Sequence, residues 1–211
     1  MAFTDFTLDK VLDRFGLNPE RHNLFPNLES IQPSAWLLET LRRSASMAFT
    51  SEKSRSEFII APVLIEAREA TGEVFSIYSG QRLDTDAAAG LIGECDFIFA
   101  KTPYIYVLRA PIVSIVEATQ ARQVHLQGQE AKKQDIEAGI GQCAAQLVAA
   151  KQFNEQRNSS FSQLYGCVTT GEVWQFICLT ENTLQLDTKR YSLEELPDLL
   201  AVFKRILEMY L

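Results

Sequence analysis

The chain has 211 residues, of which 46% are hydrophobic and 22% are charged, and its net charge is −7 at pH 7. This size and composition predict one ordinary globular domain with a sizeable core. The acidic balance argues against a generally basic nucleic-acid binder, although a local groove could still be positive. No apolar run approaches the roughly 20 residues that span a bilayer, and the N-terminus lacks a signal-peptide pattern, so we expect a cytoplasmic protein outside the membrane.

The cysteines lie singly within apolar segments, and no two of them form a C-x-x-C pair. Free cysteine is among the most buried residue types, so these four are predicted to be reduced core residues. Neither a zinc site nor a disulfide framework is indicated. The residues are Cys95, Cys143, Cys167 and Cys178.

The first 33 residues are expected to form an N-terminal extension that packs on the main domain of residues 34–211. A short amphipathic helix is predicted near Leu8 to Phe15, because Gly16 and Pro19 would end it. A loop is expected to follow it, over 23–33.

Two helices are predicted next. Ser34 is a plausible N-cap for the first, and the second is expected to run over 51–68, with Pro62 permitting a kink. Glu52 and Glu57 lie near the start of the second helix. On physical grounds alone, both could simply be solvated carboxylates that favour the positive end of a helix.

Four β-rich runs follow, over 74–78, 91–100, 104–108 and 111–118. Asp96 interrupts one of these runs and Glu117 comes near the end of another. Carboxylates on buried strands are costly to desolvate unless a cation compensates them. In a chain with few histidines, this pattern indicates a divalent-metal site.

Residues 119–129 are polar and lack periodicity, so an exposed loop is expected there. His125 lies in this loop and is interpreted as a solvated histidine, because no second His or Cys accompanies it at ligand spacing. A long helix is predicted from about Gln134 to Phe153, with its apolar residues on one face.

The C-terminal part is predicted to be a meander followed by a helix. Strands are expected over 161–169 and 173–180 around a tight turn, with a third short strand over 183–187. Ser192 and Glu195 form a capping-box pattern that begins the last helix. The order of elements suggests an α/β or α+β protein whose sheet is flanked by helices.

Four segments, taken together and in this order, resemble the restriction-endonuclease-like PD-(D/E)XK nuclease superfamily, and in particular its small stand-alone bacterial members. The resemblance covers about residues 35–207. It includes the predicted helix over 51–64, which precedes the four segments. They are Gly93-Glu-Cys-Asp-Phe-Ile98, Val116-Glu-Ala118, Gly139-Ile-Gly-Gln-Cys143 and Gly166-Cys-Val-Thr-Thr-Gly171.

The resemblance implies an α/β fold with a restriction-endonuclease-like core, a mixed central β-sheet flanked by α-helices. It also implies Mg²⁺, or Mn²⁺, as cofactor, DNA as substrate, and a homodimer as a possible assembly. Asp96 and Glu117 match the family's metal-binding acids, and Glu52 or Glu57 matches a helix glutamate that often completes the site. Gln142 matches a glutamine on the following helix that would touch substrate or the metal's water.

The sequence departs from the family pattern at Thr119, where the family has a lysine that positions or activates water. About 13 residues are inserted before Lys132, which is the next candidate. Lys132 could fold back from a long hairpin extension, or Glu130 and Lys132 could form the motif in a shifted strand, or the site could be inactive. We slightly prefer the account in which Lys132 folds back from a hairpin to the account in which the site is inactive. The shifted strand is the least favoured, because Gly128 and the Gln-rich run make a poor core strand.

Two functions from different classes therefore remain. One is a Mg²⁺-dependent nuclease in which Asp96, Glu117, Lys132 and Gln142 act on DNA. The other is an inactive nuclease-like fold that serves in protein association or nucleic-acid binding. The acidic net charge and Thr119 favour the second, and the retention of Asp96, Glu117 and Gln142 favours the first.

Overall fold

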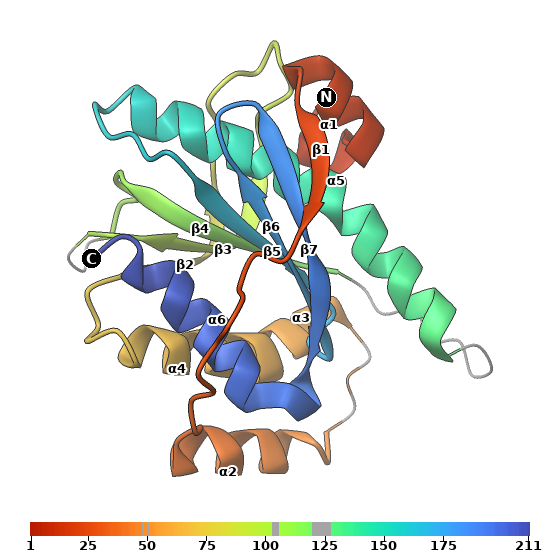
Figure 1. The fold of residues 1–211 in the computed structure, drawn as a ribbon, viewed down its shortest axis with the longest axis vertical. Helices are drawn as coiled ribbons and strands as arrows, with labels where there is room; N and C mark the ends of the chain where they lie inside the picture. The colour runs from red at the N-terminus through yellow and green to blue at the C-terminus, as the bar shows by residue number, and fades with distance from the viewer. Residues whose placement is uncertain (48, 50, 103–105, 120–127) are drawn as a thin grey trace.

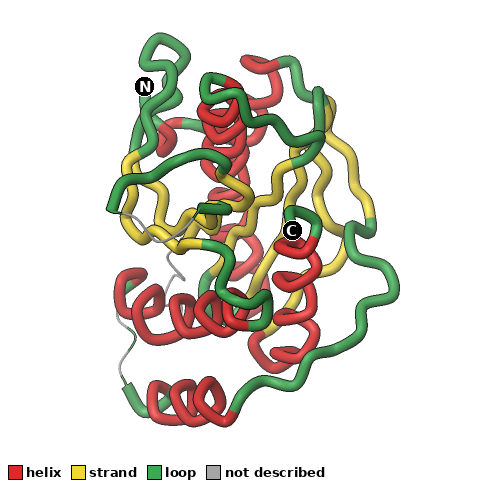
Figure 2. The backbone as a smooth tube through the Cα atoms, turned by 90° about the vertical axis from the view of Figure 1, so that its left-hand side faces the viewer, coloured by secondary structure: helices red, strands yellow, loops and turns green. Residues whose placement is uncertain are grey.

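A mixed sheet of seven strands, in the order β1-β7-β6-β5-β4-β3-β2, forms the centre of the molecule. The computed structural model describes residues 1–47, 49, 51–102, 106–119 and 128–211, except for the side chains of residues 128–135. Figures 1 and 2 show the sheet between two helical layers, with α1 and α5 on one side and α4, α6 and the outermost α2 on the other. The fold is therefore α/β, as the sequence predicts.

The strands and helices have the following bounds. The strands are β1 (Asn18–His22), β2 (Ser76–Arg82), β3 (Glu94–Ala100), β4 (Ile112–Ala118), β5 (Leu164–Thr169), β6 (Val173–Leu179) and β7 (Thr183–Ser192). The α-helices are α1 (Leu8–Phe15), α2 (Ala35–Ser44), α3 (Glu52–Arg55), α4 (Ala61–Glu69), α5 (Gly128–Glu155) and α6 (Leu196–Glu208). Short helical turns are η1 (Phe3–Asp5), η2 (Ser56–Ile60) and η3 (Leu193–Glu195).

The pairing of the central strands determines which strand ends lie together. β4 and β5 are parallel, and the chain between them contains α5, as a parallel crossover requires. β3 is antiparallel to β4, and β6 is antiparallel to β5. The start of β3 and the carboxyl ends of β4 and β5 therefore lie at the same end of the sheet.

Each face of the sheet has its own hydrophobic core. Toward α5, Ile98 and Ile115 pack with Ile140, and toward α6, Phe99 and Phe176 pack with Phe203. Ile98 and Phe99 are neighbours on one strand, so the period-two alternation of strand side chains assigns them to opposite faces. The four cysteines are free and buried, which confirms the prediction that they are unpaired core residues.

The N-terminal region contributes a strand to the sheet, which the sequence analysis did not predict. β1 pairs in parallel with β7 at the sheet edge, and Phe3 and Val11 are buried in the α5-side core. All five residues of β1 are exposed, and one of them is Pro19. A wholly polar edge strand has no hydrophobic alternation, and proline is tolerated at an edge, so its sequence resembles a loop.

The second predicted helix is present, but it contains a π-helical turn. Between α3 and α4, the N–H of Ala61 donates to the carbonyl of Ser56. This wide turn immediately precedes Pro62, which lies in the first turn of α4 and has no N–H to donate. The irregularity therefore falls one turn earlier than the predicted kink at Pro62.

Two further predictions are wrong in the described part of the chain. Residues 106–108 of the predicted 104–108 strand form no strand, and Tyr106 and Val107 are exposed. A high strand propensity does not make a strand unless a neighbouring strand is there to pair with it. Residues 103–105 lie outside the described residues. The long helix begins at Gly128, six residues before the predicted start at Gln134. Residues 128–133 are mostly good helix formers that carry no hydrophobic period of their own.

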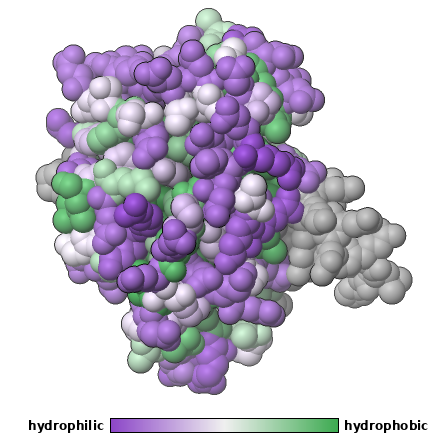
Figure 3. All heavy atoms as spheres, viewed as in Figure 1, coloured by the Kyte–Doolittle hydropathy of each residue, from purple (hydrophilic) through white to green (hydrophobic). Residues whose placement is uncertain are grey.

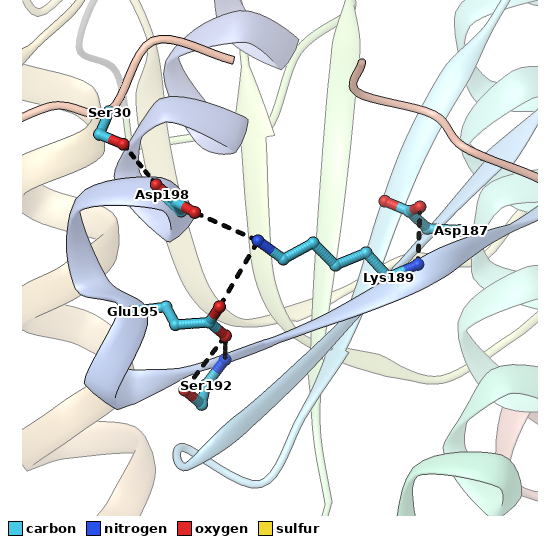
Figure 4. Close-up of polar contacts among 6 residues, drawn as sticks. All are labelled: Ser30, Asp187, Lys189, Ser192, Glu195 and Asp198. Carbon is cyan, nitrogen blue, oxygen red and sulfur yellow. Dashed lines mark hydrogen bonds and ion pairs between the residues drawn. The ribbon is translucent and has the colours of Figure 1, made fainter. Parts of the chain in front are cut away.

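Lys189 links β7 to the start of α6 (Figure 4). Its ammonium lies 3.1 Å from Asp198 and 3.5 Å from Glu195. The hydroxyl of Ser30 donates to Asp198 as well, so the N-terminal segment is tied to the same helix. Ser192 and Glu195 are hydrogen bonded as the predicted capping box requires. These contacts fix the corner where the sheet meets α6.

The face shown in Figure 3, which is the same face as in Figure 1, is mainly hydrophilic, with small separate groups of hydrophobic residues. Large exposed hydrophobic side chains in the described chain include Trp36, Leu38 and Ile65. None of the helices in the described residues has the length and apolar character needed to cross a membrane.

Candidate functional site

Asp96 lies where β3 separates from β4. At this end of the two strands, the last backbone pair joins Phe97 and Val116. One residue further, Oδ2 of Asp96 accepts a hydrogen bond of 2.7 Å from the backbone N–H of Ala118. The carboxylate thus takes the place of a backbone acceptor and is anchored directly beside the end of β4.

Glu117 is buried beside Asp96, with 5% of its surface exposed. Its Oε1 accepts from the side-chain amide of Gln142, and its Oε2 accepts from that of Gln146 at 2.7 Å. The carboxyls of Asp96 and Glu117 lie close enough that each one alters the pKa of the other. The structure therefore brings together Asp96, Glu117 and Gln142, three of the residues that the sequence analysis selected.

The proximity of the two acids disfavours ionisation of both. Burial raises the pKa of Asp96, and the nearby charge of Glu94 raises it further. Burial and the charge of Asp96 raise the pKa of Glu117 well above its usual range. Two carboxyls this close cannot both ionise without a cost in free energy, and a cation bound between them would offset that cost.

The structure distinguishes the two candidate helix glutamates. Glu52 lines the same cavity as Asp96 and Glu117, and its pKa is raised by burial and by the charge of Asp96. Glu57 lines an adjoining cavity of about 380 Å³, which Asp96 and Lys53 also line but Glu117 does not, and it lies 3.9 Å from the ammonium of Lys53. Of the two, Glu52 is therefore the one that faces the pair.

The cavity over the acids has a volume of about 580 Å³. No lysine or arginine is among its lining residues in the described chain, whereas four carboxylates are: Glu52, Glu94, Asp96 and Glu117. Sequence reasoning missed Glu94, although its position two residues before Asp96 on a strand was a usable signal. A cavity of this composition concentrates negative charge and attracts cations.

Helix α5 approaches the strand ends closely because of Gly139. A Cβ placed on this glycine would lie 2.5 Å from Cγ2 of Thr119 and 2.6 Å from Cγ1 of Val168. Without that clearance, the helix could not bring its glutamines to Glu117. Gln146, which sequence reasoning missed, comes one helical turn after Gln142 and on the same face, and this i, i+4 spacing was a signal for it.

Thr119 directly follows the end of β4, and the backbone of Lys132 lies in α5. Thr119 continues the β4–β5 pairing, because its N–H donates to the carbonyl of Thr169 at 2.8 Å. The backbone of residues 130–132 is in α5, so the shifted-strand account of Glu130 and Lys132 is wrong, whereas the hairpin account depends on residues 120–127, which lie outside the described residues. The side chains of Glu130 and Lys132, and the whole of His125, lie outside the described residues.

The cysteine thiols near the acids do not supply a nucleophile. Burial raises the pKa of the Cys95 thiol, and the charge of Glu117 raises it further. Burial and Glu117 also raise the pKa of Cys143. Only a thiolate is an effective nucleophile, so both residues remain inert packing groups.

The chemistry of the site fits a small, hard divalent cation. Its side-chain donors are all oxygens, and a cation would relieve the repulsion between Asp96 and Glu117. In addition, Oε1 of Gln146 is buried without a hydrogen-bond partner. The described residues contain no group of three or more His, Cys, Asp or Glu side chains already arranged as a metal cage. Mg²⁺ commonly binds through one or two carboxylates, with waters and substrate phosphates as its remaining ligands.

No model of a known protein family matches the chain, and no curated protein matches its sequence.

Proposed function

We propose that the chain is a metal-dependent nuclease with a restriction-endonuclease-like core that hydrolyses phosphodiester bonds in DNA. The observation that carries this proposal is the pair formed by the buried Glu117 and the half-buried Asp96. The two carboxyls come from adjacent strands, alter each other's pKa, and line a cavity that no described lysine or arginine lines. Charge balance at neutral pH therefore favours a cation, and Mg²⁺ or Mn²⁺ suits the oxygen donors.

The residues of the site divide into holding and orienting groups. Asp96 and Glu117 would hold the metal, with Glu52 as a third carboxylate at the same cavity. Gln142 and Gln146 each donate to one oxygen of Glu117, so its plane is fixed before substrate arrives. When bound, the metal would polarise a phosphoryl oxygen and supply a nucleophilic water at neutral pH.

The alternative is a nuclease-like fold without activity that binds protein or nucleic acid. Thr119 favours it, because a threonine stands where the family has a lysine, and its backbone N–H is engaged by Thr169. DNA as partner and a homodimer remain predictions under either function.

Cleavage of plasmid and linear DNA with Mg²⁺ or Mn²⁺ tests the proposal. We expect Asp96→Asn and Glu117→Gln to lower the rate by about 100-fold or more, because several kcal/mol of charge stabilisation would be lost. Asp13→Asn and Glu69→Gln change exposed carboxyls elsewhere and serve as matched controls.

Metal binding must be measured beside cleavage, because it separates the two functions. A wild type that binds Mn²⁺ and cleaves supports the nuclease. A wild type that binds nucleic acid without cleaving supports the alternative. Cleavage that persists at the wild-type rate in Asp96→Asn would show that the activity comes from elsewhere.

A further inference from the structure

Arg55 is a buried cation close to the candidate site. Its exposed fraction is 9%, and no other lysine or arginine with a described side chain is buried. Its Nη2 donates to the carbonyl of Phe49 at 3.3 Å. A guanidinium has five N–H donors, and a buried charge without an opposite charge is costly.

No carboxylate compensates this guanidinium within the part of the chain that is described. Arg55 takes part in none of the ion pairs found there. The nearest ion pairs along the chain are Lys53 with Glu57 and Arg68 with Glu73. Glu52 lies one helical turn before Arg55, and the two form no ion pair among those found in the described residues. Among the described residues, the positive charge of Arg55 therefore has no carboxylate partner, and an external anion would compensate it.

The stem of Arg55 packs on the turn between β5 and β6. A Cβ placed on Gly171 would lie 3.6 Å from Cβ and 3.7 Å from Cδ of Arg55. Gly171 comes two residues after Thr169, and Thr169 pairs with Ala118 of β4. Arg55 thus lies at the same end of the sheet as Asp96. Neighbouring strands are about 4.8 Å apart, so the separation between β3 and β5 is on the order of 10 Å.

The turn under Arg55 is held rigidly by its two threonines. Oγ1 of Thr169 donates to the carbonyl of Val173 and accepts from the N–H of Gly171, each at 2.9 Å. The hydroxyl of Thr170 accepts from the N–H of Val173 at 3.3 Å. Gly171 has a φ of +86°, which other residues rarely adopt. The Thr-Thr-Gly segment thereby forms a fixed platform for the arginine stem.

We propose that Arg55 binds a phosphate of the nucleic-acid backbone, next to the phosphate that lies over Asp96 and Glu117. This inference rests on the proposed nuclease function and names a substrate contact outside the metal site. The four carboxylates of the cavity repel a polyanion, so an adjacent cation is needed to hold the strand there. A guanidinium suits this task because its planar fork can donate two parallel hydrogen bonds to one phosphate.

DNA affinity in Ca²⁺, across a series of salt concentrations, tests this contact. A fluorescein-labelled duplex is the probe, and Ca²⁺ replaces Mg²⁺ to suppress hydrolysis. For Arg55→Met we expect about tenfold weaker binding and a salt dependence whose slope is smaller by about 0.9, since one phosphate contact is lost. Arg43→Met, which removes an exposed arginine on α2, should change neither quantity.

Wild-type protein provides a second measurement that does not depend on the variant's folding. The Nε–Hε resonance of Arg55 should shift when the duplex is added in Ca²⁺, and that of Arg43 should not. If wild type binds and cleaves DNA, but the Arg55 resonance, affinity and salt slope stay unchanged, the Arg55 contact is wrong and the nuclease stands. If wild type neither binds nor cleaves nucleic acid, the proposed function fails and the contact fails with it.

Discussion

Asp96 accepts a hydrogen bond from the backbone N–H of Ala118 at the point where β3 and β4 separate. The contact places a carboxylate between two strands, directly beside Glu117. This arrangement costs stability, because burial and mutual repulsion both disfavour the charged forms. A binding site that destabilises the free protein has consequences that can be measured without any substrate.

The first prediction concerns Asp96→Asn. The asparagine keeps an oxygen for the N–H of Ala118 and removes one charge of the pair. Because burial and the charge of Glu94 raise the pKa of Asp96, its ionised form lowers stability, so we expect the metal-free variant to have a higher unfolding free energy than wild type at pH 8. Urea denaturation measures this gain, with Asp13→Asn as control. A loss of stability would mean that the carboxylate is needed for folding.

The second prediction concerns pH. The pKa values of Glu52, Asp96 and Glu117 are higher in the folded protein than in the unfolded chain. Their contribution therefore favours the folded state below the unfolded pKa values of about 4, and is lost as pH rises through the folded values. Without divalent cations, the part of the unfolding free energy that depends on these groups should fall as pH rises.

Millimolar Mn²⁺ should reverse that fall, because a ligand that binds only the folded state stabilises it. Denaturation curves over a range of pH, with and without Mn²⁺, make the comparison. Wild type and Asp96→Asn should differ most at high pH without metal. Identical pH profiles for the two proteins would contradict the coupling of the carboxyls.

The third prediction concerns Gln146, whose amide holds Oε2 of Glu117. Groups that orient a metal-binding carboxylate typically contribute 10- to 100-fold in affinity. We expect Gln146→Leu to weaken Mn²⁺ binding by about that factor, as titration calorimetry would show. Gln152→Leu, on the same helix and away from the acids, is the matched control. Equal affinities in the two variants would reduce Gln146 to a packing residue.

The fourth prediction concerns Lys132. It precedes Gln142 by ten residues, so at about 1.5 Å per residue its backbone lies roughly 15 Å further along α5. That separation is longer than a lysine side chain, so we expect Lys132→Ala to lower the cleavage rate less than tenfold, whereas Glu117→Gln should lower it about 100-fold or more. Loss of all activity in Lys132→Ala would instead restore the lysine as the third element of the site.

The fifth prediction concerns acid stability at the corner of β7 and α6. The Ser30 hydroxyl, and then Lys189, lower the pKa of Asp198. A lowered carboxyl pKa adds stability above the unfolded value, and this stability is lost as pH falls through the folded value. Ser30→Ala should raise the pKa of Asp198 and reduce stability at pH 7 more than at pH 2. Side-chain carboxyl NMR would follow the titration.

The sequence was sufficient to predict those elements whose hydrophobic alternation or capping pattern lies within their own residues. The alternation around Phe97 and the capping box at Ser192 correspond to observed structure, and so does the α/β class. The strand β1 was not predictable, because its stability comes from pairing with β7 and not from burial of its own side chains. Within the site, Asp96 and Glu117 could be selected as costly carboxylates on buried strands. The choice of Glu52 over Glu57 required the actual direction of the helix.

Binding of Mn²⁺ to wild type, Asp96→Asn and Glu117→Gln tests the central claim most directly. Electron paramagnetic resonance of free Mn²⁺ gives the affinity without requiring any substrate. The account predicts saturable binding to wild type and at least tenfold weaker binding to both variants, with Glu69→Gln unchanged. Equal binding by all four proteins, or none by wild type, would contradict a cation held between Asp96 and Glu117.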